Sequence, residues 1–177
     1  MKKNRKIVKN LVLDVDGVMT SGQFFYDKNG KCIKVFGPDD NDALSILSHY
    51  INIVFVTGDR KGFAISKRRI EKDMKFKIYL VSTLKRVEWI KKRFDLSNTI
   101  YMGDGIFDYI VMKKVNYSIA PNNADISCKK YANYITKRKG GDRAVAEACL
   151  HILKKFFKIN SIEGVKLKGK LSGEWTA

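Results

Sequence analysis

The sequence predicts an α/β protein, a three-layer sandwich in which helices cover both faces of a central, mainly parallel sheet, with a small β-hairpin flap. Three observations favour this fold. Short apolar segments and longer helical segments alternate about six times along the chain, which is typical of parallel strands joined by helices. The 177 residues are enough for one domain with a buried core. The chain contains no internal repeat and no linker that would divide it.

Six apolar segments are predicted to be buried strands, at residues 7–15, 51–56, 78–81, 99–102, 117–120 and 134–136. The predicted helices alternate with them at residues 40–50, 61–74, 83–94, 106–113, 124–131 and 143–157. Asp142 is expected to cap the last helix. Asn29-Gly30 lies between two strand-like segments and predicts a hairpin. We therefore expect one Rossmann-like domain over residues 1–157, with the hairpin flap at about 21–36, and a C-terminal tail at 158–177.

The composition favours a cytoplasmic protein. The mean hydropathy is −0.26, and no apolar run is long enough to span a bilayer. The apolar run that follows the basic start ends at Asp14, so we expect no signal peptide. Three irregularly spaced cysteines, Cys32, Cys128 and Cys149, are expected to be reduced thiols.

The net charge of +17 is spread along the whole chain. It predicts a solvated basic surface, and such a field would also attract acidic substrates such as sugar phosphates. Nucleic-acid binding is disfavoured, because no basic stripe with interleaved aromatic residues is present.

Polar residues that suit phosphoryl transfer follow several predicted strands. Asp14 and Asp16 end the first strand, where positions i and i+2 share one face. Two acids so close together require a cation, and their hard oxygen ligands suit Mg²⁺. The later strand ends add Thr57, Lys85, Asp104 and Asp108. The carboxyl ends of parallel strands share one edge, so a nucleophile, a metal site and cationic charge are expected to converge there.

As a set, these residues resemble the four signature motifs of the haloacid dehalogenase superfamily of phosphatases. The motifs read Asp14-x-Asp16-Gly17-Val18-x-Thr20, Thr57-Gly58, Lys85 and Gly103-Asp104-x-x-x-Asp108. The resemblance runs from about residue 9 to about residue 153.

The resemblance implies a role for each of these residues. Asp14 would attack phosphorus, and Asp16 would protonate the leaving oxygen and then activate water. Thr57 and Lys85 would hold the phosphoryl oxygens. Asp104 would bind Mg²⁺ together with the Asp14 carboxylate and the Asp16 backbone carbonyl. The supporting residues would be Asp108, which would orient Lys85 or a metal-bound water, with Gly58 and Gly103.

The spacing of the motifs narrows the resemblance to one group. Only about forty residues separate Asp16 from Thr57, and they are used by the hairpin and one helix, so no cap domain fits. This is similar to the capless group that contains 3-deoxy-D-manno-octulosonate 8-phosphate phosphatase, of lipopolysaccharide biosynthesis, and the acylneuraminate 9-phosphate phosphatases. The resemblance implies a homotetramer in which the hairpin and a neighbour's tail help to close the site.

The substrate stays open at this point. Asp59 directly follows Thr57-Gly58 and resembles the nonulosonate 9-phosphate enzymes rather than the octulosonate enzymes. Candidate substrate contacts are Asp40, Asp42, Arg60 and Arg69. The structural alternative is favoured for each of them: the acids belong to a helix N-terminus and the arginines to a solvated helix.

Two further functions are weaker candidates. One is a polynucleotide 3'-phosphatase, which the positive charge suggests. The other is a non-enzymatic partner of a sugar-activating cytidylyltransferase, which is disfavoured because Asp14 and Asp16 are both present.

Overall fold

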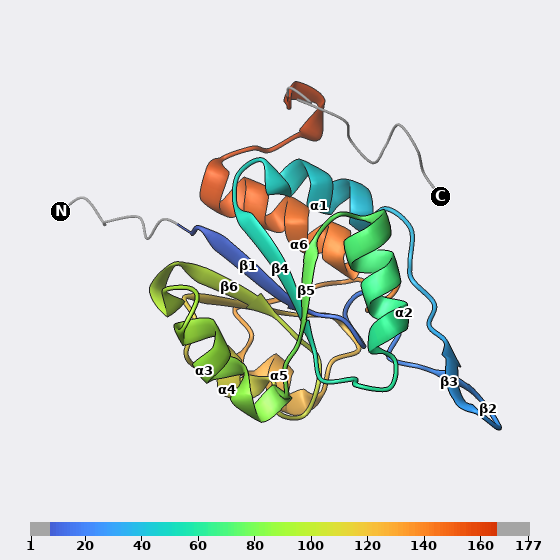
Figure 1. Ribbon diagram of the computed structural model, residues 1–177. Helices are drawn as coiled ribbons and strands as arrows, with labels where there is room; N and C mark the ends of the chain where they lie inside the picture. Colours follow the sequence, from blue (N-terminus) through green and yellow to red (C-terminus); the bar gives the residue numbers. More distant parts are fainter. Residues whose placement is uncertain (1–7, 166–177) are drawn as a thin grey trace.

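A six-stranded sheet forms the centre of the protein (Figure 1). The computed structural model describes residues 8–165. The strands lie in the order β5–β4–β1–β6–β7–β8, and every neighbouring pair is parallel. Their bounds are Asn10–Asp14 for β1, Asn52–Thr57 for β4, Lys77–Leu80 for β5, Thr99–Met102 for β6, Tyr117–Ala120 for β7 and Tyr134–Ile135 for β8. The prediction of a mainly parallel α/β sandwich is confirmed.

Helices cover both faces of this sheet (Figure 1). One layer contains α1 (Asp40–Ser48), α2 (Phe63–Lys67) and α6 (Ala144–Ile152), and the other contains α3 (Arg86–Lys91), α4 (Tyr109–Met112) and α5 (Ile126–Tyr131). Successive side chains of a strand point to opposite faces, so Leu11 and Leu13 pack toward the first layer and Val12 toward the second. Both layers therefore hold β1 rigidly in the middle of the sandwich.

Shorter helical segments complete the chain. α2 continues as a π-helical segment at Arg68–Asp73, and α6 continues as another at Leu153–Phe157. Single 3₁₀ turns occur at Thr83–Lys85, Leu96–Asn98 and Ile162–Gly164. Within the described part of the chain, no helix is both long and apolar enough to cross a bilayer.

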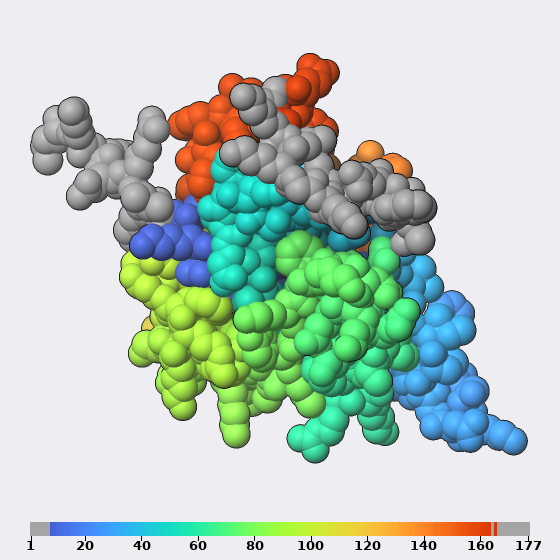
Figure 2. Space-filling view, turned by 45° about the horizontal axis from the view of Figure 1, so that its top comes forward, coloured from blue at the N-terminus to red at the C-terminus, as the bar shows by residue number. Residues whose placement is uncertain are grey.

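The hairpin projects from the sandwich (Figures 1 and 2). It consists of β2 (Phe25–Asp27) and β3 (Gly30–Ile33), which are antiparallel. A single bridge between Thr20 and Phe36 closes its base. The expected hairpin is present with shorter strands, and Lys28 and Asn29 make the turn between the paired Asp27 and Gly30.

The last helix begins differently from our expectation. Asp142 does not cap it; Arg143 is the residue before α6, in a left-handed conformation (φ 64°), and no side chain makes a capping hydrogen bond. The physical reason lies in the preceding Gly140-Gly141. A Cβ at Gly140 would overlap the backbone of Gly17, so the chain enters α6 from a close backbone contact. The remaining tail, from residue 166, lies outside the described residues, and the domain boundaries stay a prediction.

Candidate active site

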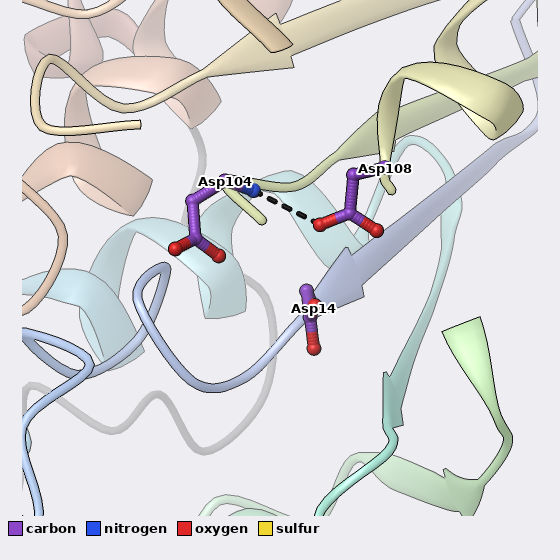
Figure 3. A group of neighbouring side chains, drawn as sticks. All are labelled: Asp14, Asp104 and Asp108. Carbon is purple, nitrogen blue, oxygen red and sulfur yellow. Dashed lines mark hydrogen bonds between the residues drawn. The ribbon is translucent and has the colours of Figure 1, made fainter. Parts of the chain in front are cut away.

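Two strand ends bring the predicted acidic residues together. β1 lies between β4 and β6, and it ends at Asp14. β6 is followed directly by Gly103 and Asp104, and Asp108 precedes α4. One carboxylate oxygen from each of Asp14, Asp104 and Asp108 lies within 4.8 Å of the others. Figure 3 shows the three side chains around one common space. The arrangement is therefore a cluster of oxygen ligands at the carboxyl edge of the sheet.

Backbone contacts hold this cluster in place. Asp108 Oδ2 accepts hydrogen bonds from the N–H groups of Asp104 (3.1 Å; Figure 3) and Gly105 (3.0 Å), which fixes the loop after β6. Gly17 has φ 84°, and a Cβ there would overlap the Asp104 carboxylate. A Cβ at Gly103 would press on Asp108 at 2.7 Å, whereas one at Gly58 would make ordinary contacts. Gly17 and Gly103 are thus needed for space, while Gly58 is not.

The cation beside Asp14 is Arg86, and this corrects the prediction for Lys85. The Arg86 guanidinium donates to both Asp14 oxygens, at 2.5 Å and 3.1 Å, and to Asp108 Oδ1 at 2.8 Å. Lys85 is exposed at the end of the 3₁₀ turn. Consecutive helical residues point about 100° apart, so only one of the two can face the sheet, and Arg86 is 1% exposed. Lys85 and Asp108 do not form the expected pair.

Tyr101 completes the network around Arg86. Its hydroxyl accepts a hydrogen bond from Arg86 at 2.7 Å and donates one to Asp108 Oδ1 at 2.6 Å. Both oxygens of Asp108 are therefore engaged, Oδ1 by Tyr101 and Arg86 and Oδ2 by the loop N–H groups. Arg86 also engages both oxygens of Asp14, so among these three carboxylates Asp104 is the one that this network of described residues leaves open to a metal ion, while Asp108 orients Arg86 and the loop.

The electrostatics of the cluster favour a cation. Burial raises the pKa of Asp14 to about 7, opposed by Arg86 and reinforced by Asp108. Burial and the nearby Asp14 and Asp108 raise the pKa of Asp104 to about 8, against the influence of Arg86. One guanidinium does not compensate three carboxylates. Mg²⁺ takes oxygen ligands and would neutralise this charge, so the residues fit the predicted magnesium site.

Asp16 and Thr57 lie together beside this cluster. The Thr57 hydroxyl is 3.2 Å from Asp16 Oδ2 and forms a hydrogen bond with it. Asp16 Oδ1 lies 2.6 Å from the ammonium of Lys34, which comes from the hairpin. Lys34 also pairs with Asp59 at 2.8 Å. Burial alone would raise the pKa of Asp59, but hydrogen bonds from Lys31 and Lys34 outweigh it and lower the pKa to about 2.

The four candidate substrate contacts are less well supported by the geometry. Asp40 is fully buried, and its Oδ1 accepts from the Ala146 N–H at 2.8 Å, so it joins α1 to α6 and is closed to a ligand. Asp42 lines a cavity of about 690 Å³ between these helices. Arg69 lines another of about 400 Å³ beside Phe36, and Arg60 is exposed. The Asp40 expectation is therefore corrected, and the other three stay predictions.

Sequence reasoning did not identify three residues of this site: Arg86, Lys34 and Tyr101. One signal for Arg86 was available, because it lies four residues before the buried Ile90 and so shares its helix face. The sequence around Lys34 carried no such signal, since both neighbours of this buried lysine are exposed.

The family comparison agrees with this geometry. Residues 81–148 match the model of the haloacid dehalogenase-like hydrolases. Over this segment the chain is similar to that family. The 3-deoxy-D-manno-octulosonate 8-phosphate phosphatase of Escherichia coli K12 is 29% identical over 165 residues, which cover 89% of this chain and 85% of that protein. The expectation of a phosphatase is confirmed by such relatives.

Solved structures of this hydrolase family agree as well. The Moraxella catarrhalis octulosonate 8-phosphate phosphatase, in complex with magnesium, phosphate and KDO, is 28% identical. It superposes with a TM-score of 0.73, covering 87% of this chain and 92% of that chain. A probable phosphatase from Pseudomonas syringae gives a TM-score of 0.80 at 27% identity, covering 93% and 96%. Like the capless group, residues 8–165 form the hydrolase sandwich and hairpin with no cap domain between them.

Proposed function

We propose that this protein is a Mg²⁺-dependent phosphatase of the cytoplasm that releases phosphate from 3-deoxy-D-manno-octulosonate 8-phosphate. The observation that carries the proposal is the cluster of Asp14, Asp104 and Asp108 around one space at the end of β1, with Arg86 against Asp14. The octulosonate relatives support the choice of substrate. When bound, Mg²⁺ would supply positive charge to the phosphoryl oxygens.

In the proposed reaction, an oxygen of Asp14 attacks phosphorus and the bond from phosphorus to the sugar oxygen breaks. Asp16 gives its proton to that leaving oxygen. Asp16 then takes a proton from water, whose oxygen attacks the aspartyl phosphate, and inorganic phosphate leaves Asp14 restored. Arg86 is placed to stabilise charge on the phosphoryl oxygens, with the Thr57 hydroxyl nearby.

The exposed apolar side chains of the hairpin support association into a homotetramer. Phe25, Tyr26, Ile33 and Val35 are each more than half exposed, at 52% to 62%. Such a patch on a projecting hairpin is typical of an interface between subunits. Analytical ultracentrifugation tests this part of the proposal: a monomer at micromolar concentration would contradict it.

The deciding experiment is a phosphate-release screen. Octulosonate 8-phosphate, neuraminate 9-phosphate and a 3'-phosphorylated oligonucleotide are compared in Mg²⁺, with the Asp14→Asn variant as the inactive control. We expect octulosonate 8-phosphate to give the highest kcat/KM. A higher kcat/KM for either other compound would contradict the proposed substrate. Substantial turnover by Asp14→Asn would contradict the aspartyl-phosphate mechanism.

A further inference from the structure

We propose that Lys34 of the hairpin is a positioning residue for Asp16, and that the hairpin thereby helps to assemble the proton donor of the active site. This inference rests on the proposed phosphatase function, because it assigns Asp16 the proton transfer to the leaving group. It adds a residue that the four signature motifs do not contain.

A closed ring of contacts joins four residues: Asp16, Thr57, Asp59 and Lys34. Thr57 lies 3.2 Å from Asp16 Oδ2, and its Oγ1 accepts the N–H of Asp59 at 3.0 Å. Asp59 Oδ2 pairs with the Lys34 ammonium at 2.8 Å, and the same ammonium lies 2.6 Å from Asp16 Oδ1. Each oxygen of Asp16 thus faces one fixed partner, so rotation of this carboxylate would break a contact on either side.

The ring also determines which way the Thr57 hydroxyl points. Because Oγ1 accepts the N–H of Asp59, the hydroxyl hydrogen is directed to Asp16 Oδ2 rather than to the Asp59 backbone. Asp59 itself is held by the N–H of Gly62 at 3.0 Å through its other oxygen. The ring is therefore anchored in the loop after β4 and needs the hairpin only for Lys34.

The Lys34 side chain is fully buried although it comes from an exposed hairpin. Its side chain has 0% exposure, although Ile33 and Val35 beside it are 52% and 55% exposed. Lysine is almost never fully buried unless its charge is paired. Three acceptors surround the ammonium: Asp16, Asp59 and the Ser66 hydroxyl at 2.9 Å. Three oxygens at 2.6, 2.8 and 2.9 Å from one ammonium indicate a built position rather than a surface lysine that happens to lie nearby.

Lys31 provides a matched comparison within the same hairpin. Its ammonium lies 2.7 Å from Asp59 Oδ2, the oxygen that Lys34 also uses. Only Lys34 of the two pairs with Asp16 among the described residues. Removing Lys31 takes one positive charge from the hairpin without opening the ring, whereas removing Lys34 opens it next to the proton donor.

The test measures how strongly each variant depends on protonation of the leaving group. Phenyl phosphate has a leaving group that needs a proton, and p-nitrophenyl phosphate has one that leaves readily without it. The ratio of kcat/KM for the two compounds is measured for wild type, Lys34→Met and Lys31→Met. General acid catalysis contributes about 10²- to 10⁴-fold, so we expect the phenyl to p-nitrophenyl ratio of Lys34→Met to fall by about 10-fold or more. The ratio of Lys31→Met should stay at the wild-type value.

Both rates are measured on one preparation, so partial unfolding of a variant cancels from the ratio. An unchanged ratio in Lys34→Met, or an equal fall in both rates, would overturn the positioning role. An equal fall in the ratio of both lysine variants would also overturn it, because charge alone would then explain the effect. Wild-type protein that releases no phosphate from either compound or from the sugar phosphates would instead refute the proposed function.

Discussion

Arg86 and Lys85 are adjacent, and replacing each by methionine tests which of them serves the site. Arg86→Met removes two hydrogen bonds to Asp14, one to Asp108 and one to Tyr101. Removing one partner of a buried ion pair costs about 3–5 kcal/mol, because the other charge stays buried without compensation. We therefore expect the free energy of unfolding to fall by about that amount when no metal is added. Lys85→Met changes an exposed side chain and should alter it by about 0.5 kcal/mol or less.

We expect Arg86→Met also to lower turnover more than Lys85→Met does. Loss of a positioned donor at the reacting group typically lowers kcat by about 10²- to 10³-fold, and we expect this of Arg86→Met in saturating Mg²⁺. Urea unfolding without metal and phosphate release with Mg²⁺ measure the two effects separately. If Lys85→Met abolished turnover while Arg86→Met kept it, the lysine would be the working cation and our account of the site would be refuted.

Three further outcomes follow from the geometry. Burial raises the pKa of Asp40 to about 7, while in an unfolded chain the pKa of this carboxyl is close to its ordinary 3.8. The unfolded state therefore loses the Asp40 proton first as the pH rises. The contribution of Asp40 to the free energy of unfolding is fully present below about pH 4 and is lost between about pH 4 and pH 7. The total loss is at most about 4 kcal/mol. The free energy of unfolding of Asp40→Asn, measured in urea, should fall less between pH 5 and pH 8 than that of wild type. An identical fall in both proteins would contradict the raised pKa of Asp40. Gly17→Ala should weaken Mg²⁺ binding, measured by calorimetry, because its Cβ would overlap Asp104, whereas Gly30→Ala (φ 121°) has nothing within 4 Å and should bind Mg²⁺ like wild type. EDTA should stop phosphate release and added Mg²⁺ restore it; full turnover in chelator would exclude the metal.

The sequence predicted those parts of the molecule that repeat a simple rule. Apolar segments alternating with helices indicated the sheet, and the rule that ligands bind at strand ends placed Asp14 and Asp104 at one edge. Thr57 follows the same rule, since it ends β4 beside β1.

The rest depended on details that no pattern expresses. Whether Lys85 or Arg86 faces the sheet depends on a rotation of one residue where a 3₁₀ turn meets α3. Lys34 lies in a hairpin without a core of its own, so no hydrophobic period marks its direction. Asp142 has the residue type of a helix cap, but the close approach of Gly140 to Gly17 decides how the chain enters α6.

The glycine contacts at the base of the hairpin have a practical consequence for protein engineering. A Cβ at Gly37 would overlap the carbonyl of Gly141, and one at Gly141 would press on the Ser21 backbone at 2.5 Å. Main chain rather than side chains thus sets the spacing between the loop after β1, the hairpin and α6. A library that varies the hairpin would have to leave these glycines untouched and use exposed positions such as Tyr26, where a new side chain does not press on the main chain.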